Sequence, residues 1–267
     1  MRETVPVWPP SLREINDLPH ADKRAIYQTL IPDWIVSMFG ITPHDPTIDG
    51  SEAIRIRCPS GSSSVEVSVY PSPEQVEPAL YLHLGDTFNF QLIVLLVVAH
   101  DPSAPRFNVD VDEHGRSTQL GACARNIPEE IRAMQAGLVP GQVRRGLRVF
   151  RAALPTFETF VAKMGHDLFL IEPMFYHNAI AFERYGFAYT RGLQDMRTIH
   201  SEFRPGGAFW AKLDGSTPFR QPEAWRSISG RSWAIQDGIL GQPFTGVQMS
   251  KRVGEEAGVD TCPGAIW

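Results

Sequence analysis

Two aspartates and a histidine occupy alternate positions in the stretch NVDVDEHG, at Asp110, Asp112 and His114. In a β-strand every second side chain points to the same face, so these three groups would converge. Two carboxylates and an imidazole can bind a divalent metal. The alternative, which we prefer, is an exposed polar strand that runs into a turn at Gly115, because a short acidic pattern is a weak signal on its own.

Basic residues gather in the stretch VPGQVRRGLRVFRAAL, where phosphate binding is the chemistry to consider. Its four arginines are Arg144, Arg145, Arg148 and Arg151. Helical spacing predicts a helix here, with one apolar face formed by Val143, Leu147, Phe150 and Leu154. Arg144 and Arg145 would lie nearest its start, where unpaired N–H groups favour anions. The alternative is a solvated helix face whose arginine stems cover apolar surface. Pro155 is expected to break or restart this helix.

Acid and base chemistry would fall to polar residues at the ends of apolar runs. Glu172 follows DLFLI and His100 follows LIVLLVVA, and active sites often open where such strands end. Tyr185, directly before Gly186, could donate a proton. The competing interpretation is structural, with loop hydrogen bonds for Glu172 and His100 and a packing role for Tyr185 at the end of a helix.

Composition limits the classes of protein and partner. The 267 residues carry a net charge of −5, which argues against nucleic acid as the main partner because phosphate binding needs a basic surface. Three scattered cysteines without a CxxC pair argue against a disulfide framework or a zinc ribbon, and favour a reducing cytoplasm. The longest apolar run, at 92–99, is too short for a membrane span of about 20 residues. No GxSxG, HExxH or Walker-type loop is present.

The elements that must position these residues follow from hydrophobic spacing. The stretch 21–40 has helical spacing that Pro32 interrupts. Between 53 and 100, alternating residues and short turns predict strands joined by hairpins, which are typical of an antiparallel arrangement. The stretch 127–138 has Pro128 near its start and Gly137 near its end, so it predicts a capped helix.

We therefore expect an α+β fold with a mixed, largely antiparallel sheet packed by helices. Residues 1–203 would form a single domain with an N-terminal helical extension. Residues 204–267 are rich in Gly, Pro and Trp, and a disordered tail is poor in aromatic residues. This segment would wrap the domain or contact a second copy of the chain in a homodimer, and a substrate lid is the alternative.

The stretch MFYHNAIAFERYGFAYTRG, at 174–192, predicts a helix that ends at Gly186 and leads into a strand. It resembles the GNAT superfamily of N-acetyltransferases, in which Ala-Ile, an aromatic residue and Glu-Lys/Arg precede Gly-Phe. The order of elements in that family, strand, phosphate-binding helix, strand and helix, is similar to the order expected over 139–192. The resemblance implies a GNAT-like second half, a bound acetyl-coenzyme A or other acyl-coenzyme A, and acyl transfer to an amine.

The resemblance also implies roles for individual residues. The cofactor would contact Arg144, Arg145, Gly146 and Asn178. Glu172 or a bound water would be the base, and Tyr185 the acid that protonates the leaving thiolate. This enzyme should show a V-shaped cleft between the strand that ends near Ala99 and the strand at 168–171.

The sequence departs from the family at cofactor and catalytic positions. Counted from Gln142, the phosphate loop places Arg145 and Leu147 where the family has small residues. The family's usual tyrosine and asparagine fall on Phe182 and Phe175. Two other hypotheses therefore stay open. One is a GNAT-like domain that binds a small ligand or a protein partner without catalysis. The other is a metal-dependent enzyme that uses the three side chains of NVDVDEHG.

Overall fold

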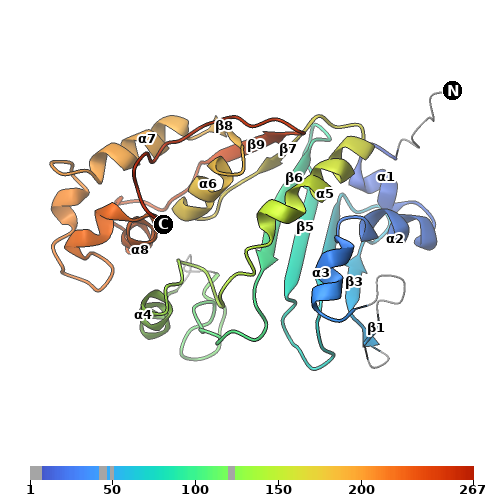
Figure 1. Cartoon of the computed structure of the whole chain (residues 1–267), viewed down its shortest axis with the longest axis horizontal. Helices are drawn as coiled ribbons and strands as arrows, with labels where there is room; N and C mark the ends of the chain where they lie inside the picture. Colours follow the sequence, from blue (N-terminus) through green and yellow to red (C-terminus); the bar gives the residue numbers. More distant parts are fainter. Residues whose placement is uncertain (1–7, 42–46, 49–50, 120–123) are drawn as a thin grey trace. The chain divides into compact units, whose positions relative to one another are not determined.

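The computed structural model describes residues 8–41, 47–48, 51–119 and 124–267. Within these ranges the chain has the expected α+β fold, with eight α-helices and an open, mostly antiparallel sheet of seven strands in the order β3-β4-β5-β6-β7-β9-β8 (Figure 1). The chain divides into two compact units. Unit 1 comprises Met1–Pro102, Gly146–Ile171 and Ser250–Glu255, and unit 2 comprises Ser103–Arg145, Glu172–Met249 and Glu256–Trp267.

Unit 1 contains most of the sheet. Its helices are α1 (Leu12–Asn16), α2 (His20–Gln28), α3 (Asp33–Met38) and α5 (Phe150–Lys163). Its strands are β1 (Thr47–Ile48), β2 (Ser51–Glu52), β3 (Ile54–Arg57), β4 (Ser64–Val69), β5 (Leu80–Asp86), β6 (Leu92–Ala99) and β7 (Leu168–Ile171). The strand β9 (Gln248–Arg252) begins in unit 2 and ends in unit 1.

The predicted hairpins of unit 1 are confirmed. The strands β3 to β6 pair antiparallel in sequence order. Alternate residues of β4, Val65, Val67 and Val69, are buried, as period-2 spacing requires. Helices α3 and α5 lie on one face of these strands (Figure 1). The predicted break at Pro32 is also confirmed, because α2 ends before it and α3 begins after it.

Polar side chains fix the short helices of unit 1 to the sheet. Asn16 is fully buried, and its amide donates to the carbonyl oxygens of Ser62 and Ser64 at 2.8 and 3.0 Å. Its Oδ1 accepts the hydroxyl of buried Tyr27.

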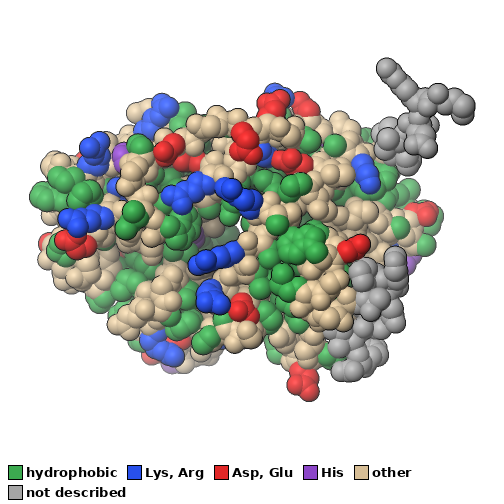
Figure 2. Space-filling model, in the orientation of Figure 1, with side chains coloured by type: hydrophobic (Ala, Val, Ile, Leu, Met, Phe, Trp, Pro, Cys, Tyr) green, Lys and Arg blue, Asp and Glu red, His purple; other side chains and the backbone are tan. Residues whose placement is uncertain are grey.

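The face of α3 that points away from the sheet stays partly exposed, with Trp34 at 42%. Hydrophobic side chains are visible on the side of the molecule that carries α3 and α5 (Figure 2).

The helix α5 begins later than predicted and continues through the proline. The prediction of a helix from 139 is wrong because the backbone at Gly146 and Leu147 pairs with the end of β6, where the Leu147 N–H donates to the Ala99 carbonyl at 3.0 Å. The next residue, Arg148, has a φ of 58°, which is outside the helical region. The predicted break at Pro155 is wrong too, since this proline lies inside α5 on its exposed side.

Unit 2 consists mainly of helices. They are α4 (Ile127–Gln135), α6 (Tyr176–Glu183), α7 (Leu193–Glu202) and α8 (Ile228–Gln236), with two 3-10 turns, η2 (Trp210–Lys212) and η3 (Pro222–Arg226). The strand β8 (Ala188–Arg191) completes the unit. The predicted α4 is confirmed, with Pro128 in its first turn. The predicted end of α6 is confirmed as well, since Gly186 has a φ of 80° and donates its N–H to the Glu183 carbonyl.

The core of unit 2 is formed by side chains from distant parts of the chain. It consists of Phe107, Val109, Ala133, Leu138, Phe219 and Trp233. Trp233 lies in α8 and stacks on Phe219, with the ring centroids 5.3 Å apart. Its indole N–H donates to the Leu138 carbonyl at 2.9 Å. Residues 204–267 therefore contain regular structure, and one of their tryptophans is part of this core.

None of the helices in the described part of the chain combines the length and the apolar character that a bilayer crossing requires. Cys58 and Cys262 carry free thiols, and Cys123 lies outside the described residues.

Candidate functional site

The parallel strands β6 and β7 of unit 1 pair only where β6 begins. Their register aligns Ile93 with Leu170 and Val94 with Ile171 among the described residues. The strand β7 ends at Ile171, whereas β6 continues to Ala99. The second half of β6 therefore runs past the end of its parallel neighbour.

Backbone N–H and C=O groups in this second half of β6 point to the strand edge that β7 does not cover. The N–H of His100 donates toward β5, to the Ala79 carbonyl at 3.0 Å. The carbonyl of Ala99 points the other way and accepts the Leu147 N–H at 3.0 Å. Because successive residues of a strand use alternate edges, the N–H and C=O of Val97 face the same edge as Ala99. An extended ligand could pair with them as a further strand would.

A β-bulge lies at the point where β6 and β7 separate. The register places His83 opposite Leu96 but Leu84 opposite Val94, which leaves Leu95 as the extra residue. The Leu95 side chain is 46% exposed. Bulges of this kind are frequent next to active sites, because they change the direction of backbone groups and side chains.

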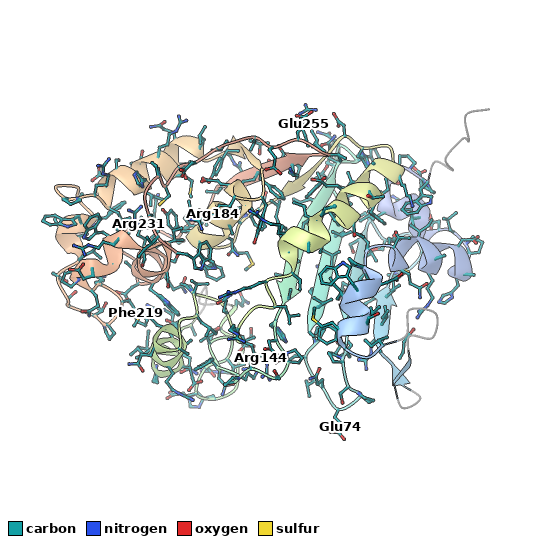
Figure 3. All side chains as sticks on the ribbon, in the orientation of Figure 1. Glu74, Arg144, Arg184, Phe219, Arg231 and Glu255 are labelled. Carbon is teal, nitrogen blue, oxygen red and sulfur yellow. The ribbon has the colours of Figure 1, made fainter. Side chains whose placement is uncertain are left out.

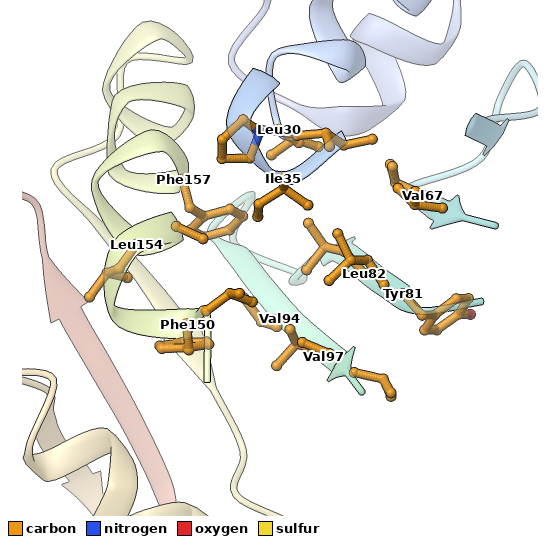
Figure 4. Close-up of a pocket in the computed structure, with 18 of the residues that line it drawn as sticks. Leu30, Ile35, Val67, Tyr81, Leu82, Val94, Val97, Phe150, Leu154 and Phe157 are labelled. Carbon is orange, nitrogen blue, oxygen red and sulfur yellow. The ribbon is translucent and has the colours of Figure 1, made fainter. Parts of the chain in front are cut away.

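A cavity of about 110 Å³ adjoins this half of β6, on the face that α3 and α5 cover (Figure 4). Its walls come from β4 to β7, from the α2–α3 connection and from the first two turns of α5, all in unit 1. Val97 faces the cavity with its side chain and the β6 edge with its backbone. The cavity and the edge are therefore parts of one site.

The lining of the cavity is apolar. Leu30 and Ile35 contribute from the α2–α3 region, and Phe150 and Phe157 from α5 (Figure 4). Tyr81 is the lining residue with a polar group, and its hydroxyl donates to Glu66 Oε2 at 3.0 Å, away from the cavity. The cavity therefore suits an alkyl or aryl group and offers no partner for a charge.

The start of α5 provides the positive end of a 14-residue helix dipole beside the cavity. Its N-cap residue, Val149, makes no side-chain capping hydrogen bond. Because the helix begins at Phe150, the arginines that flank its first turn are Arg148 and Arg151, and both are exposed. Arg144 and Arg145, predicted to lie at the helix start, precede it and belong to unit 2.

The predicted cofactor residues are divided between the two units. Gly146 belongs to unit 1, whereas Arg144, Arg145 and Asn178 belong to unit 2. Arg144 is half-buried and donates from Nη1 to the Ala104 carbonyl (labelled in Figure 3), and Arg145 is exposed. Asn178 is half-buried in the first turn of α6.

The predicted acid and base lie at the two ends of the segment that contains α6. Glu172 directly follows β7, is exposed, and accepts a hydrogen bond from the side chain of Gln248 at 3.0 Å. Tyr185 directly follows the C-cap residue Arg184, is half-buried, and donates its N–H to the Phe182 carbonyl.

The strand predicted around Asp110 is wrong, because turns lie at 109–110 and 113–115 and only an isolated bridge, between Val111 and Ser117, separates them. Asp112 closes the turn by accepting the N–H groups of His114 and Arg116, both at 2.9 Å. The hydrogen bond from the Arg116 N–H, together with those from the Arg116 guanidinium and the His114 N–H, lowers the pKa of the Asp112 carboxyl. Asp110 accepts from the Arg106 guanidinium at 2.8 Å. Across the described ranges, no three His, Cys, Asp or Glu side chains are placed to hold a metal ion.

Glu183, the glutamate of the AFERYGF stretch, has a structural role. It is 5% exposed and accepts the N–H of Thr261 at 3.0 Å together with the hydroxyls of Thr261 and Tyr189. Burial raises the pKa of this carboxyl. Glu183 therefore connects the end of α6 to the C-terminal stretch of unit 2.

A buried polar cluster of unit 2 gave no signal in the sequence. The Tyr176 hydroxyl and Arg231 Nη1 both donate to Cys262 Sγ, at 3.2 and 3.0 Å, and Arg231 is marked in Figure 3. Arg231 also lies 3.0 Å from His200 Nδ1 and donates from Nε to the Trp225 carbonyl. Burial raises the pKa of the Cys262 thiol. Because the thiol and its two donors are enclosed, the cluster is an anchor for the C-terminal stretch.

The site in unit 1 thus combines a strand edge, a β-bulge, a helix start and an apolar cavity. Neither a protein-family model nor a curated protein nor a solved structure matches this chain.

Proposed function

We propose that this protein is an acyl-coenzyme A-dependent N-acyltransferase that acts on an amine. The observation that carries the proposal is the separation of β6 from β7 beside an apolar cavity. The order β6, α5, β7, α6 supports it, because it follows the layout of the GNAT superfamily, which the stretch 174–192 resembles, although the chain inserts α4 between β6 and α5. A V-shaped cleft at this place is what such an enzyme would need, and the short pairing of β6 with β7 supports the proposal.

Two parts of the coenzyme suit the features of unit 1. Its amide-containing arm is extended and can pair with the N–H and C=O of Val97, as a strand would. Its pyrophosphate suits the start of α5, where the helix dipole favours an anion. Arg148 and Arg151 flank that helix start and supply positive charge.

The reaction itself is a direct transfer. The amine nitrogen attacks the thioester carbonyl, a new C–N bond forms, and the C–S bond breaks. A base takes the proton from the amine, an acid protonates the thiolate, and backbone N–H groups stabilise the oxyanion. Glu172 and Tyr185 remain the predicted base and acid, and substitution of each residue tests that assignment.

One observation favours the second candidate function, which is binding without catalysis. The Leu147 N–H is already paired with the Ala99 carbonyl, so it cannot hold a phosphate in this conformation. A protein that had lost turnover could keep the edge of β6 and the cavity for a small ligand or a partner.

The first test is the binding of acetyl-coenzyme A and free coenzyme A, measured by calorimetry for the wild type and for Arg148→Ala. We expect the substitution to weaken binding about tenfold, which is roughly 1.4 kcal/mol, because one charged contact to phosphate is lost. The matched control is Arg57→Ala on the edge strand β3, where the arginine is 79% exposed and its pair with Glu66 is long, at 3.4 Å. This control should bind like the wild type.

The outcomes separate the two functions. No binding of either coenzyme to the wild type at millimolar concentration contradicts both the transferase and its cofactor. Binding without release of free thiol from acetyl-coenzyme A in the presence of an amine mixture favours binding without catalysis. A double variant, Arg144→Ala with Arg145→Ala, tests the residues predicted from the sequence alone.

A further inference from the structure

We propose that the cavity of unit 1 holds the acyl chain of the donor, and that this chain contains about four to five carbon atoms rather than two. The inference rests on the proposed function, because the chain is taken to be carried by coenzyme A. It goes further in naming the class of donor, a short aliphatic acyl-coenzyme A.

The size of the cavity indicates how long an acyl chain it can hold. Protein interiors are packed like organic crystals, and voids larger than a water molecule are few. A dry apolar cavity of about 150 Å³ admits benzene, with six carbon atoms. Scaled from that case, 110 Å³ corresponds to about four to five carbon atoms. An acetyl group would leave most of this space empty.

Short side chains in the lining keep this space open. Ala153 faces the cavity from α5, and β6 supplies Val94, Val97 and Ala99, whose side chains are short. Larger apolar residues at these positions would close the cavity, and filling such voids usually stabilises a fold. The lining is apolar, so a hydrocarbon chain loses no hydrogen bond on entering it.

The cavity lies beside the part of β6 proposed to bind the arm of the coenzyme. The backbone of Val97 faces the edge proposed for the extended arm of the coenzyme, and its side chain faces the cavity. A group at the end of a chain paired along β6 therefore has the cavity beside it. Phe150 and Leu154, from the first two turns of α5, form the wall on that side (Figure 4).

The test compares the dissociation constants of butyryl-, acetyl- and free coenzyme A by calorimetry. We expect butyryl-coenzyme A to bind about tenfold more tightly than acetyl-coenzyme A, because two more methylene groups leave water. In Ala153→Leu, which fills the cavity, this ratio should fall to about one. The matched control is Ala152→Leu, the same change at the neighbouring exposed position, which should keep the ratio. If Ala153→Leu fails to fold, Ala153→Val adds less volume and serves instead.

A second probe separates this inference from the proposed function. Benzene should raise the melting temperature of the wild type and leave that of Ala153→Leu unchanged, since only the wild type keeps the cavity. If both coenzymes bind with equal affinity and benzene has no effect, the acyl-chain inference is wrong and the transferase stands. If benzene binds and no coenzyme derivative does, the acyl assignment fails together with the proposed function.

Discussion

Replacing Asp237 with alanine is expected to lower the free energy of unfolding by about 3–5 kcal/mol, the range for breaking a buried ion pair. The Asp237 side chain is 11% exposed and accepts from two guanidinium groups, Arg125 at 3.0 Å and Arg220 at 2.8 Å. It also accepts the Thr217 hydroxyl at 2.9 Å. Without the carboxylate, half-buried Arg125 would keep its ion pair with Glu130, whereas half-buried Arg220 would lose the carboxylate that its Nε binds.

Urea denaturation at pH 7 measures this loss. Asp195→Asn is the control, because Asp195 is an exposed carboxylate in the first turn of α7, where such a charge contributes about 0.3–1 kcal/mol. A double-mutant cycle with Arg220→Ala should give a coupling energy of about 1 kcal/mol or more with Asp237→Ala. A loss below about 1 kcal/mol for Asp237→Ala would show that this network does not hold unit 2 together.

Acid is expected to destabilise the protein through His177, in the first turn of α6. This side chain is 5% exposed, and its Nδ1 has no hydrogen-bond partner within the described residues. Burial lowers its pKa to about 3, whereas an unfolded histidine has a pKa of about 6.5. Between these values the unfolded state binds the proton and the folded state does not, so stability is full above pH 6.5 and falls as the pH decreases. At pH 4.5 the loss is about two pKa units, or roughly 2.7 kcal/mol.

The measurement is the difference in unfolding free energy between pH 7 and pH 4.5. In His177→Phe this difference should shrink by roughly 2.7 kcal/mol, because no group remains at that position to take up a proton. Phenylalanine suits the site, since the ring of His177 already stacks on Phe175 at 5.5 Å. His114→Gln, at an exposed histidine, should keep the wild-type pH dependence. Equal pH dependence in the two variants would contradict a neutral, buried His177.

The sequence predicted those elements whose pattern is local. Alternation in SVEVSV placed Val65, Val67 and Val69 on one buried face, and the two sides of Pro32 became separate helices. The start of α5 at Phe150 could not be predicted from the local spacing of hydrophobic residues. Helical spacing continues from Val143 to Leu154, but the backbone near Leu147 pairs with a strand nearly fifty positions earlier in the chain.

The candidate site was less predictable than the fold. A cleft near Ala99 was expected, but the edge at Val97 depends on where β7 stops, and that depends on the pairing of Val94 with Ile171. The cavity is a difference between packed volumes, which residue types alone do not give. The carboxylates at Asp110 and Asp112 suggested a metal, and their arginine partners could be identified only in three dimensions.

The last short stretch of unit 1, Ser250–Glu255, sets the order in which the chain can complete this unit during synthesis. Lys251 is 2% exposed, lies 3.5 Å from Glu158 of α5 and donates to the Glu255 carbonyl, so this stretch is an integral part of the unit. The ribosome makes Ile171 before it makes Glu172–Met249, which takes about 4–16 s at roughly 5–20 residues per second. Throughout that interval the edge of β7 that pairs with β9 in the folded protein stays unpaired. An unpaired strand edge is a template for association with other chains. In the nascent chain this edge is therefore open to association that β9 prevents in the folded protein.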